Sequence, residues 1–183
     1  MDWQGKRILV VGIGRSGFDV AQVLGLQGAQ VTACDAGTPA LAQDLEAMGV
    51  RVLTGWRAGL PDEPFEIVVT SPSVPADSSI LQEAVAKGIP VWSEIEVAYH
   101  LTQSPIIAVT GTNGKSTTSA LIAHILNTAG YRAVLCGNIA ADGLERTLTD
   151  AAVSAQPEDI LVAEVSSFQL EWVHEFCPHV GVW

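Results

Sequence analysis

The segment from Thr110 to Thr117 reads Thr-Gly-Thr-Asn-Gly-Lys-Ser-Thr, a combination of residues suited to binding a phosphate chain. Glycines let the backbone curl so that its amides point at phosphate oxygens. Lys115 can reach the outer phosphates, and the hydroxyl of Ser116 can coordinate Mg²⁺. We therefore predict an ATP-binding loop, whose members are Gly111, Thr112, Asn113, Gly114, Lys115, Ser116 and Thr117.

The spacing of this loop departs from the usual phosphate-loop pattern. Gly111 and Gly114 are separated by two residues, where the common motif has four. The alternative interpretation is a glycine turn with a solvated lysine. The loop interpretation is favoured because an apolar strand pattern precedes the segment and a helical pattern follows it.

Glu164 stands near the end of a second apolar segment, Ile160–Val165. In a protein with a phosphate loop, a carboxylate at this position completes the oxygen ligands of Mg²⁺. We predict that Ser116 and Glu164 hold the metal and that Lys115 and Glu164 are catalytic. The alternative role for Glu164 is to cap the helix expected after it.

A second glycine motif, Gly12-Ile13-Gly14-Arg15-Ser16-Gly17, follows the first apolar segment of the chain. In this position the backbone amides can face a diphosphate, and Asp35 at the end of the next strand can accept a ribose hydroxyl. The motif does not distinguish NAD from a UDP compound, and its glycines could simply allow a tight turn.

The loop Thr70–Pro75 offers hydroxyls for a second phosphate, or is a proline-stiffened turn. Gly137-Asn138 ends another strand and offers an amide to a ligand, or is a turn.

Elements that would position these residues alternate between short apolar runs and helical patterns, which predicts an α/β fold with parallel sheets. The polar stretch Thr102–Pro105 is a plausible linker. We expect a Rossmann-like doubly wound domain over residues 1–101 and an incomplete ATP-binding α/β domain with a phosphate loop over residues 102–183. Expected strands are Arg7–Val11, Gln30–Cys34, Val50–Leu53, Glu66–Thr70, Pro90–Trp92, Ile106–Thr110, Ala133–Cys136, Ile160–Val165 and Val180–Trp183. Expected helices are Gly17–Leu26, Leu41–Met48, Ile80–Lys87, Glu94–Leu101, Ser116–Ala129 and Phe168–Phe176.

Composition limits the possible partners. The formal net charge is −11, which disfavours nucleic acid and anionic membranes because both are bound by clustered Lys and Arg. Three dispersed cysteines indicate neither a disulfide framework nor a zinc ribbon, and the four histidines share no metal-ligand spacing. No long apolar run is present, so we expect a cytoplasmic protein.

Four segments together resemble the Mur ligases of peptidoglycan synthesis, most closely the branch that adds D-glutamate: Ser93–Glu96, Thr110–Thr117, Gly137–Ile139 and Glu164–Glu171. The resemblance implies that the first domain binds UDP-N-acetylmuramoyl-L-alanine rather than NAD. The substrate carboxylate would attack ATP to give an acyl phosphate, which D-glutamate then attacks. The implied UDP-substrate residues are Gly14, Arg15, Ser16, Asp35, Ser71, Ser73 and Asn138, with Gln169 helping to place the substrate or the metal.

One departure from the family concerns Ala36-Gly37, where relatives carry a basic residue, and it leaves uracil recognition open. We expect a chain truncated at Trp183, inactive alone, monomeric when full length, and binding ATP with Mg²⁺ as cofactors. Alternatives are another Mur ligase, a folylpolyglutamate synthase relative, a non-catalytic nucleotide-sugar binding module and an NAD-dependent dehydrogenase.

Overall fold

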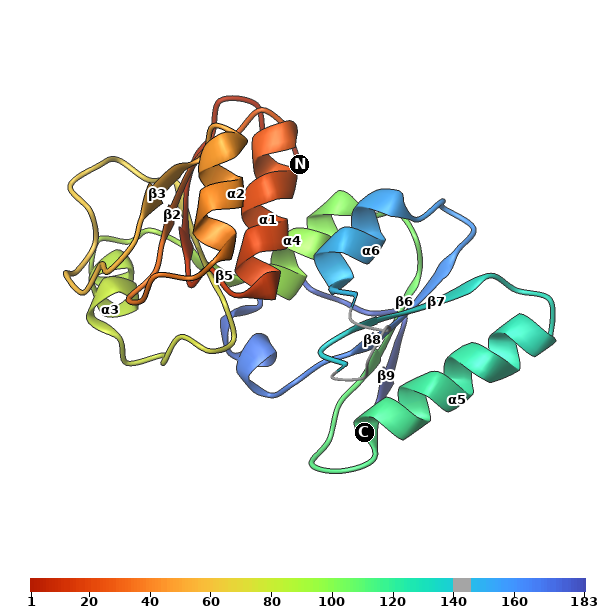
Figure 1. The fold of residues 1–183 in the computed structure, drawn as a ribbon. Helices are drawn as coiled ribbons and strands as arrows, with labels where there is room; N and C mark the ends of the chain where they lie inside the picture. Colours follow the sequence, from red (N-terminus) through yellow and green to blue (C-terminus); the bar gives the residue numbers. More distant parts are fainter. Residues whose placement is uncertain (140–145) are drawn as a thin grey trace.

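The computed structural model describes residues 1–139 and 146–183, which form two parallel β-sheets lying next to each other (Figure 1). The first sheet has the strand order β3-β2-β1-β4-β5 and the second β7-β8-β6-β9. All strand pairs in both sheets are parallel, so the α/β expectation is confirmed. Parallel strands place all their carboxyl ends at one edge, where the loops that follow them come together.

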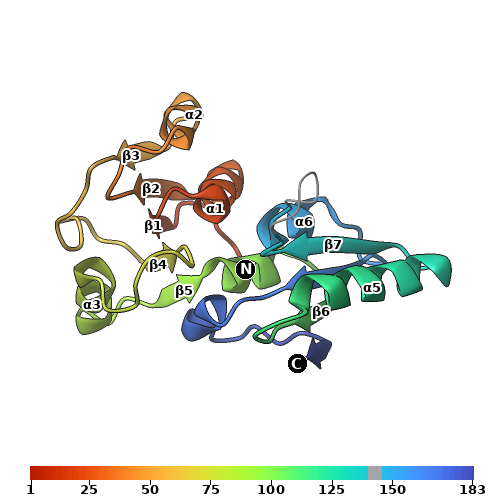
Figure 2. The ribbon, with the colours of Figure 1, turned by 60° about the horizontal axis from the view of Figure 1, so that its bottom comes forward.

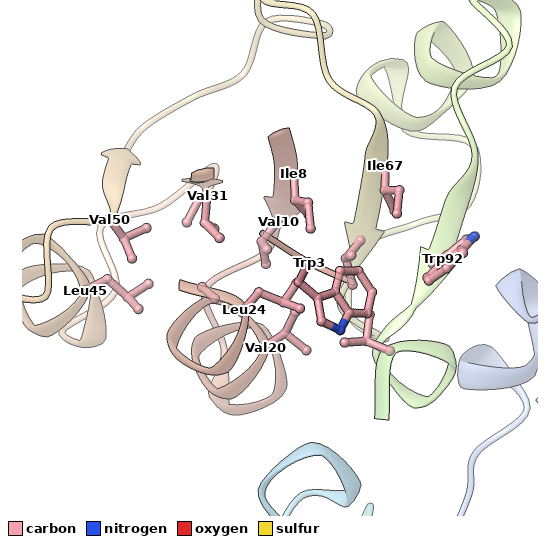
Figure 3. Close-up of a cluster of buried hydrophobic side chains, with 14 of the residues drawn as sticks. Trp3, Ile8, Val10, Val20, Leu24, Val31, Leu45, Val50, Ile67 and Trp92 are labelled. Carbon is pink, nitrogen blue, oxygen red and sulfur yellow. The ribbon is translucent and has the colours of Figure 1, made fainter. Parts of the chain in front are cut away.

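Helices cover both faces of the first sheet. Its strands are β1 (Arg7–Val11), β2 (Gln30–Cys34), β3 (Arg51–Leu53), β4 (Ile67–Thr70) and β5 (Val91–Ser93), and its helices are α1 (Arg15–Leu26), α2 (Leu41–Ala47) and α3 (Ser79–Ala86). Side chains of a strand alternate between faces. Ile8 and Val10 accordingly pack in the cluster with α1 and α2 that Figure 3 shows, whereas Leu9 and Val11 pack with α3.

The second sheet consists of β6 (Ile106–Val109), β7 (Ala133–Gly137), β8 (Ile160–Glu164) and β9 (Val180–Val182). Helix α5 (Lys115–Thr128) packs along one face, and α6 (Leu148–Ser154) covers the other (Figure 2). Helix α4 (Glu94–Leu101) joins the two sheets. Its Val97 belongs to the core of the first sheet, and its Ile95 and Ala98 belong to that of the second.

Most element bounds lie within two residues of those expected, but two elements differ. The helix predicted over Phe168–Phe176 is wrong: the structure has a 3-10 helix, η1 (Phe168–Trp172), followed by irregular chain. That irregular chain donates three backbone N–H groups to the buried carboxylate of Glu96, which replaces the bonds a longer helix would make. Helix α6 was not expected, although Thr147 caps it by accepting from the Asp150 N–H at 3.1 Å.

None of the helices in the described ranges is long and apolar enough to cross a membrane.

Candidate functional site

The predicted phosphate loop connects β6 to α5 and has the required curled backbone. Gly111 has φ 132° and Gly114, at the N-cap of α5, has φ 78°, a region that favours glycine. Lys115 begins the helix, and its Nζ donates to the Gly111 carbonyl at 3.1 Å. The lysine side chain therefore folds back over the loop, where it can meet a phosphate group.

Glu164 and Ser116 meet although 48 residues separate them: the Ser116 hydroxyl donates to Glu164 Oε2 at 2.6 Å. The contact arises because β6 and β8 are neighbours, with Val109 paired to Glu164 at the carboxyl edge. A hydroxyl and a carboxylate are the oxygen ligands that Mg²⁺ prefers, usually together with phosphate oxygens and water. These two residues fit a magnesium ion. In the described parts of the chain, no group of three or more His, Cys, Asp or Glu side chains could hold a metal by itself.

Asp35 accepts hydrogen bonds that hold the loop containing the glycine motif in place. Its Oδ2 accepts the N–H of Ile13 and its Oδ1 accepts the N–H of Gly37, both at 2.7 Å. The carboxylate thus joins the loop after β1 to the loop after β2. Its role in this structure is to shape the site, and each oxygen retains a further acceptor direction for a ligand.

Ser71 and Ser73, both predicted to contact substrate, have different surroundings. Ser71 is buried and its hydroxyl donates to the Gly12 carbonyl at 2.8 Å, so it helps to hold the glycine loop in place. Ser73 lines a cavity of about 360 Å³ together with Asp35. Trp56 and Arg57 line the same cavity, and sequence reasoning missed them because the loop after β3 carries no recognisable motif.

A second cavity, of about 220 Å³, lies where the two sheets meet. It brings together Arg15 and Ser16 at the start of α1 and Asn138 after β7. Glu94, Arg146, Thr147 and Gln169 also belong to its polar lining. Gly14 is the N-cap residue of α1, directly before Arg15. Of the predicted substrate residues, Asp35 and Ser73 therefore line one cavity and Arg15, Ser16 and Asn138 the other, whereas Gly14 and Ser71 line neither.

Glu94 is the most unusual residue of this second cavity. It is 2% exposed, and burial raises its pKa to about 7, against the hydrogen bond from Gln169, which lowers it. Gln169 Nε2 donates to Glu94 Oε1 at 2.5 Å. In the sequence Glu94 belongs to the segment Ser93–Glu96, which resembles the family but indicates no role for this residue.

Another cavity, of about 630 Å³, lies away from these residues. It is lined by Arg7, Gln30 and Arg51, which stand at the amino ends of strands of the first sheet. Because ligands of parallel sheets bind at the carboxyl edge, we do not assign the site to it.

Two family models match the chain. The Mur ligase MurD-like N-terminal domain matches residues 6–93, and the Mur ligase middle domain matches residues 109–183. The UDP-N-acetylmuramoylalanine--D-glutamate ligase of Pelotomaculum thermopropionicum is 44% identical over 99% of this chain and 40% of its own length. The enzyme of the same name from a Geobacillus species is 39% identical over 98% of this chain and 40% of its own length. The chain thus spans about 40% of the length of these curated relatives.

Solved structures agree at the level of the fold. The UDP-N-acetylmuramate:L-alanyl-gamma-D-glutamyl-meso-diaminopimelate ligase from Neisseria meningitides has a TM-score of 0.53 at 22% identity, covering 90% of this chain and 55% of its own. The UDP-N-acetylmuramate-alanine ligase from Thermotoga maritima has a TM-score of 0.52 at 20% identity, covering 87% and 37%.

Proposed function

The chain belongs to the Mur ligase family, and from this premise we propose that it serves the ATP-dependent joining of D-glutamate to UDP-N-acetylmuramoyl-L-alanine. The relatives at 39–44% identity that bear the name of this ligase support the choice of substrates. The observation that carries the proposal is the contact between Ser116 and Glu164 beside Lys115, because it gathers phosphate and magnesium ligands at one loop.

Each residue of this group has a distinct part in the proposed reaction. Lys115 would bind the outer phosphates of ATP, and the loop amides would hold the remaining phosphate oxygens. Ser116 and Glu164 would hold magnesium, which supplies positive charge to offset that of the transferred phosphoryl group. The substrate carboxylate would then attack that phosphoryl group, so catalysis rests on positioning and electrostatics.

The uridine diphosphate end of the substrate is proposed to bind at the carboxyl edge of the first sheet. Asp35 and Ser73 line the cavity there, and α1 begins directly after Gly14, so the first backbone amides of this helix would be donors for a diphosphate. Arg57 is the cationic residue of the lining and could take the place of the basic residue that Ala36-Gly37 lacks. The muramoyl end would extend into the cavity between the sheets, towards Asn138 and Gln169.

Other Mur ligases are the main competing assignment, because the solved structures that share the fold carry the names of two of them. Comparing UDP-N-acetylmuramoyl-L-alanine with UDP-N-acetylmuramate separates the possibilities. If the chain takes part in D-glutamate addition, it should bind the alanyl compound more tightly. If it takes part in alanine addition, it should bind the compound without alanine more tightly.

The magnesium-nucleotide part of the proposal is tested with Lys115→Ala. We expect the affinity for ATP in the presence of magnesium, measured by displacement of a fluorescent ATP analogue, to fall about tenfold or more as a charge-assisted contact is lost. Lys87→Ala is the matched control, since Lys87 is exposed at the end of α3. Unchanged ATP affinity in folded Lys115→Ala would support the non-catalytic module instead.

A further inference from the structure

Glu94 holds Gln169 in one orientation. Gln169 Oε1 accepts the N–H of Ser166 at 2.7 Å, and its Nε2 donates to Glu94 Oε1 at 2.5 Å. Exchanging the amide oxygen and nitrogen would oppose a donor to the Ser166 N–H, so the two contacts together fix the amide. One N–H of Gln169 is then left for the cavity between the sheets, which Gln169 lines.

The other oxygen of Glu94 is buried without a partner. Among the described residues, no group donates to Glu94 Oε2, although Glu94 is 2% exposed. A buried acceptor without a hydrogen bond costs roughly 1–3 kcal/mol, so such atoms in folded proteins usually meet a ligand or an ordered water. Glu94 belongs to the lining of the cavity of about 220 Å³. Its Oε2 has almost no exposed surface, so a small shift of the lining side chains would bring this oxygen to a donor on a molecule bound there.

The charged residues of the cavity limit which chemical groups of a ligand could donate to Glu94 Oε2. Arg15 and Arg146 line the cavity, which disfavours a cationic ligand group, and an anionic group has no hydrogen to donate to Oε2. A neutral N–H donor satisfies both conditions. An acylated amino sugar that bears an amide-linked amino acid carries such groups.

We propose that Glu94 contacts the substrate directly: Oε2 accepts a hydrogen bond from an amide N–H of the acylated sugar or its amino acid, while Oε1 orients Gln169. This inference rests on the proposed function, because it requires the muramoyl end of the substrate to lie in the cavity between the sheets. It adds a recognition residue to α4, the helix that joins the two sheets.

Glu94→Gln tests the proposal with little change of shape. The new side chain keeps a carbonyl oxygen that can accept from Gln169, but it has an N–H₂ group in place of Oε2. This N–H₂ group and the amide N–H of the substrate are both donors, so the proposed hydrogen bond could not form. We expect the affinity for UDP-N-acetylmuramoyl-L-alanine to fall about tenfold and the affinity for UDP alone to stay the same. Glu46→Gln, which removes an exposed carboxylate from α2, should change neither affinity.

The outcomes separate this inference from the proposed function. If folded Glu94→Gln binds both compounds as the parent chain does, Glu94 is a structural residue and the inference is wrong, while the proposed function stands. An equal loss of both affinities would likewise overturn it. If the parent chain binds neither compound, the proposed function fails, and the inference with it.

A spectroscopic measurement serves if Glu94→Gln does not fold. The side-chain carboxyl carbon of Glu94 can be followed by carbon-13 NMR in the unmodified chain. We expect its resonance to move when UDP-N-acetylmuramoyl-L-alanine is added and to stay in place with UDP. No movement at saturating substrate would overturn the inference.

Discussion

Single side chains of the candidate site hold its loops in place. Asp35 accepts two backbone N–H groups, from Ile13 and Gly37, and Ser71 donates to the Gly12 carbonyl. These contacts fix the loops after β1, β2 and β4 relative to one another. A substitution at either residue is therefore expected to change loop shape together with any direct contact.

Arg57 offers a cleaner test of recognition because its side chain is exposed and lines the cavity at the first sheet. Arg57→Ala should weaken UDP binding by about fivefold to tenfold and leave the free energy of unfolding within about 0.5 kcal/mol of the parent value. Calorimetric titration with UDP and urea unfolding measure the two quantities.

Arg51→Ala is the matched control for this experiment, since Arg51 belongs to the same sheet but lines the cavity at the amino ends of the strands. Its removal should leave UDP affinity unchanged. Equal loss of affinity in both variants would indicate a general effect of net charge and contradict the assignment of Arg57.

At the scale of elements, the close packing of α1 against the loop after β1 determines the shape of the candidate site at the first sheet. A Cβ atom added at Gly17 would lie 1.9 Å from the Gly12 carbonyl oxygen, whereas one added at Gly14 would meet nothing within 4 Å. The two glycines of one motif therefore have different physical functions. Gly17 permits close packing, and Gly14 keeps the backbone accessible.

The pair Gly17→Ala and Gly14→Ala separates these functions. Gly17→Ala should lower the free energy of unfolding by about 2–4 kcal/mol, because the clash is with backbone that cannot move without displacing α1. Gly14→Ala should change stability by less than about 1 kcal/mol but reduce UDP affinity if a diphosphate lies against its backbone. Urea unfolding and calorimetric titration give the two readouts, and equal stability of both variants would contradict the account.

How far the sequence predicted these elements depended on the range of the interactions involved. The apolar runs of β1 and β8 predicted their strands because burial on both faces of a sheet leaves a local signal. The end of η1 depends on Glu96, nearly eighty residues earlier in the chain, so no local pattern could indicate it. The same holds for Arg57, whose place in a cavity follows from the fold alone.

At the scale of the whole molecule, contacts of α4 and α6 hold the two sheets together. Glu96 on α4 accepts backbone N–H groups of His174, Glu175 and Phe176 at 2.8 to 3.0 Å. Thr147, which caps α6, donates to Asp19 Oδ2 of α1 at 2.6 Å. Since one candidate cavity lies between the sheets, these contacts fix the distance between its two walls.

Glu96→Ala should therefore destabilise the chain strongly. It would leave three backbone N–H groups without their acceptor, and we expect the free energy of unfolding to fall by about 3 kcal/mol or more. Differential scanning calorimetry measures the loss, with Glu46→Ala on the exposed side of α2 as the control. A loss below about 1 kcal/mol would show that the contacts of Glu96 contribute little to holding the sheets together.

The first sheet is proposed to bind a uridine diphosphate sugar and not a nicotinamide dinucleotide. The direct measurement is calorimetric titration of the chain, shown to be folded by circular dichroism, with UDP-N-acetylmuramoyl-L-alanine and separately with NADH. We predict heat of binding from the UDP compound and none from NADH. Binding of NADH without binding of the UDP compound would contradict the account and would indicate an NAD-dependent dehydrogenase instead.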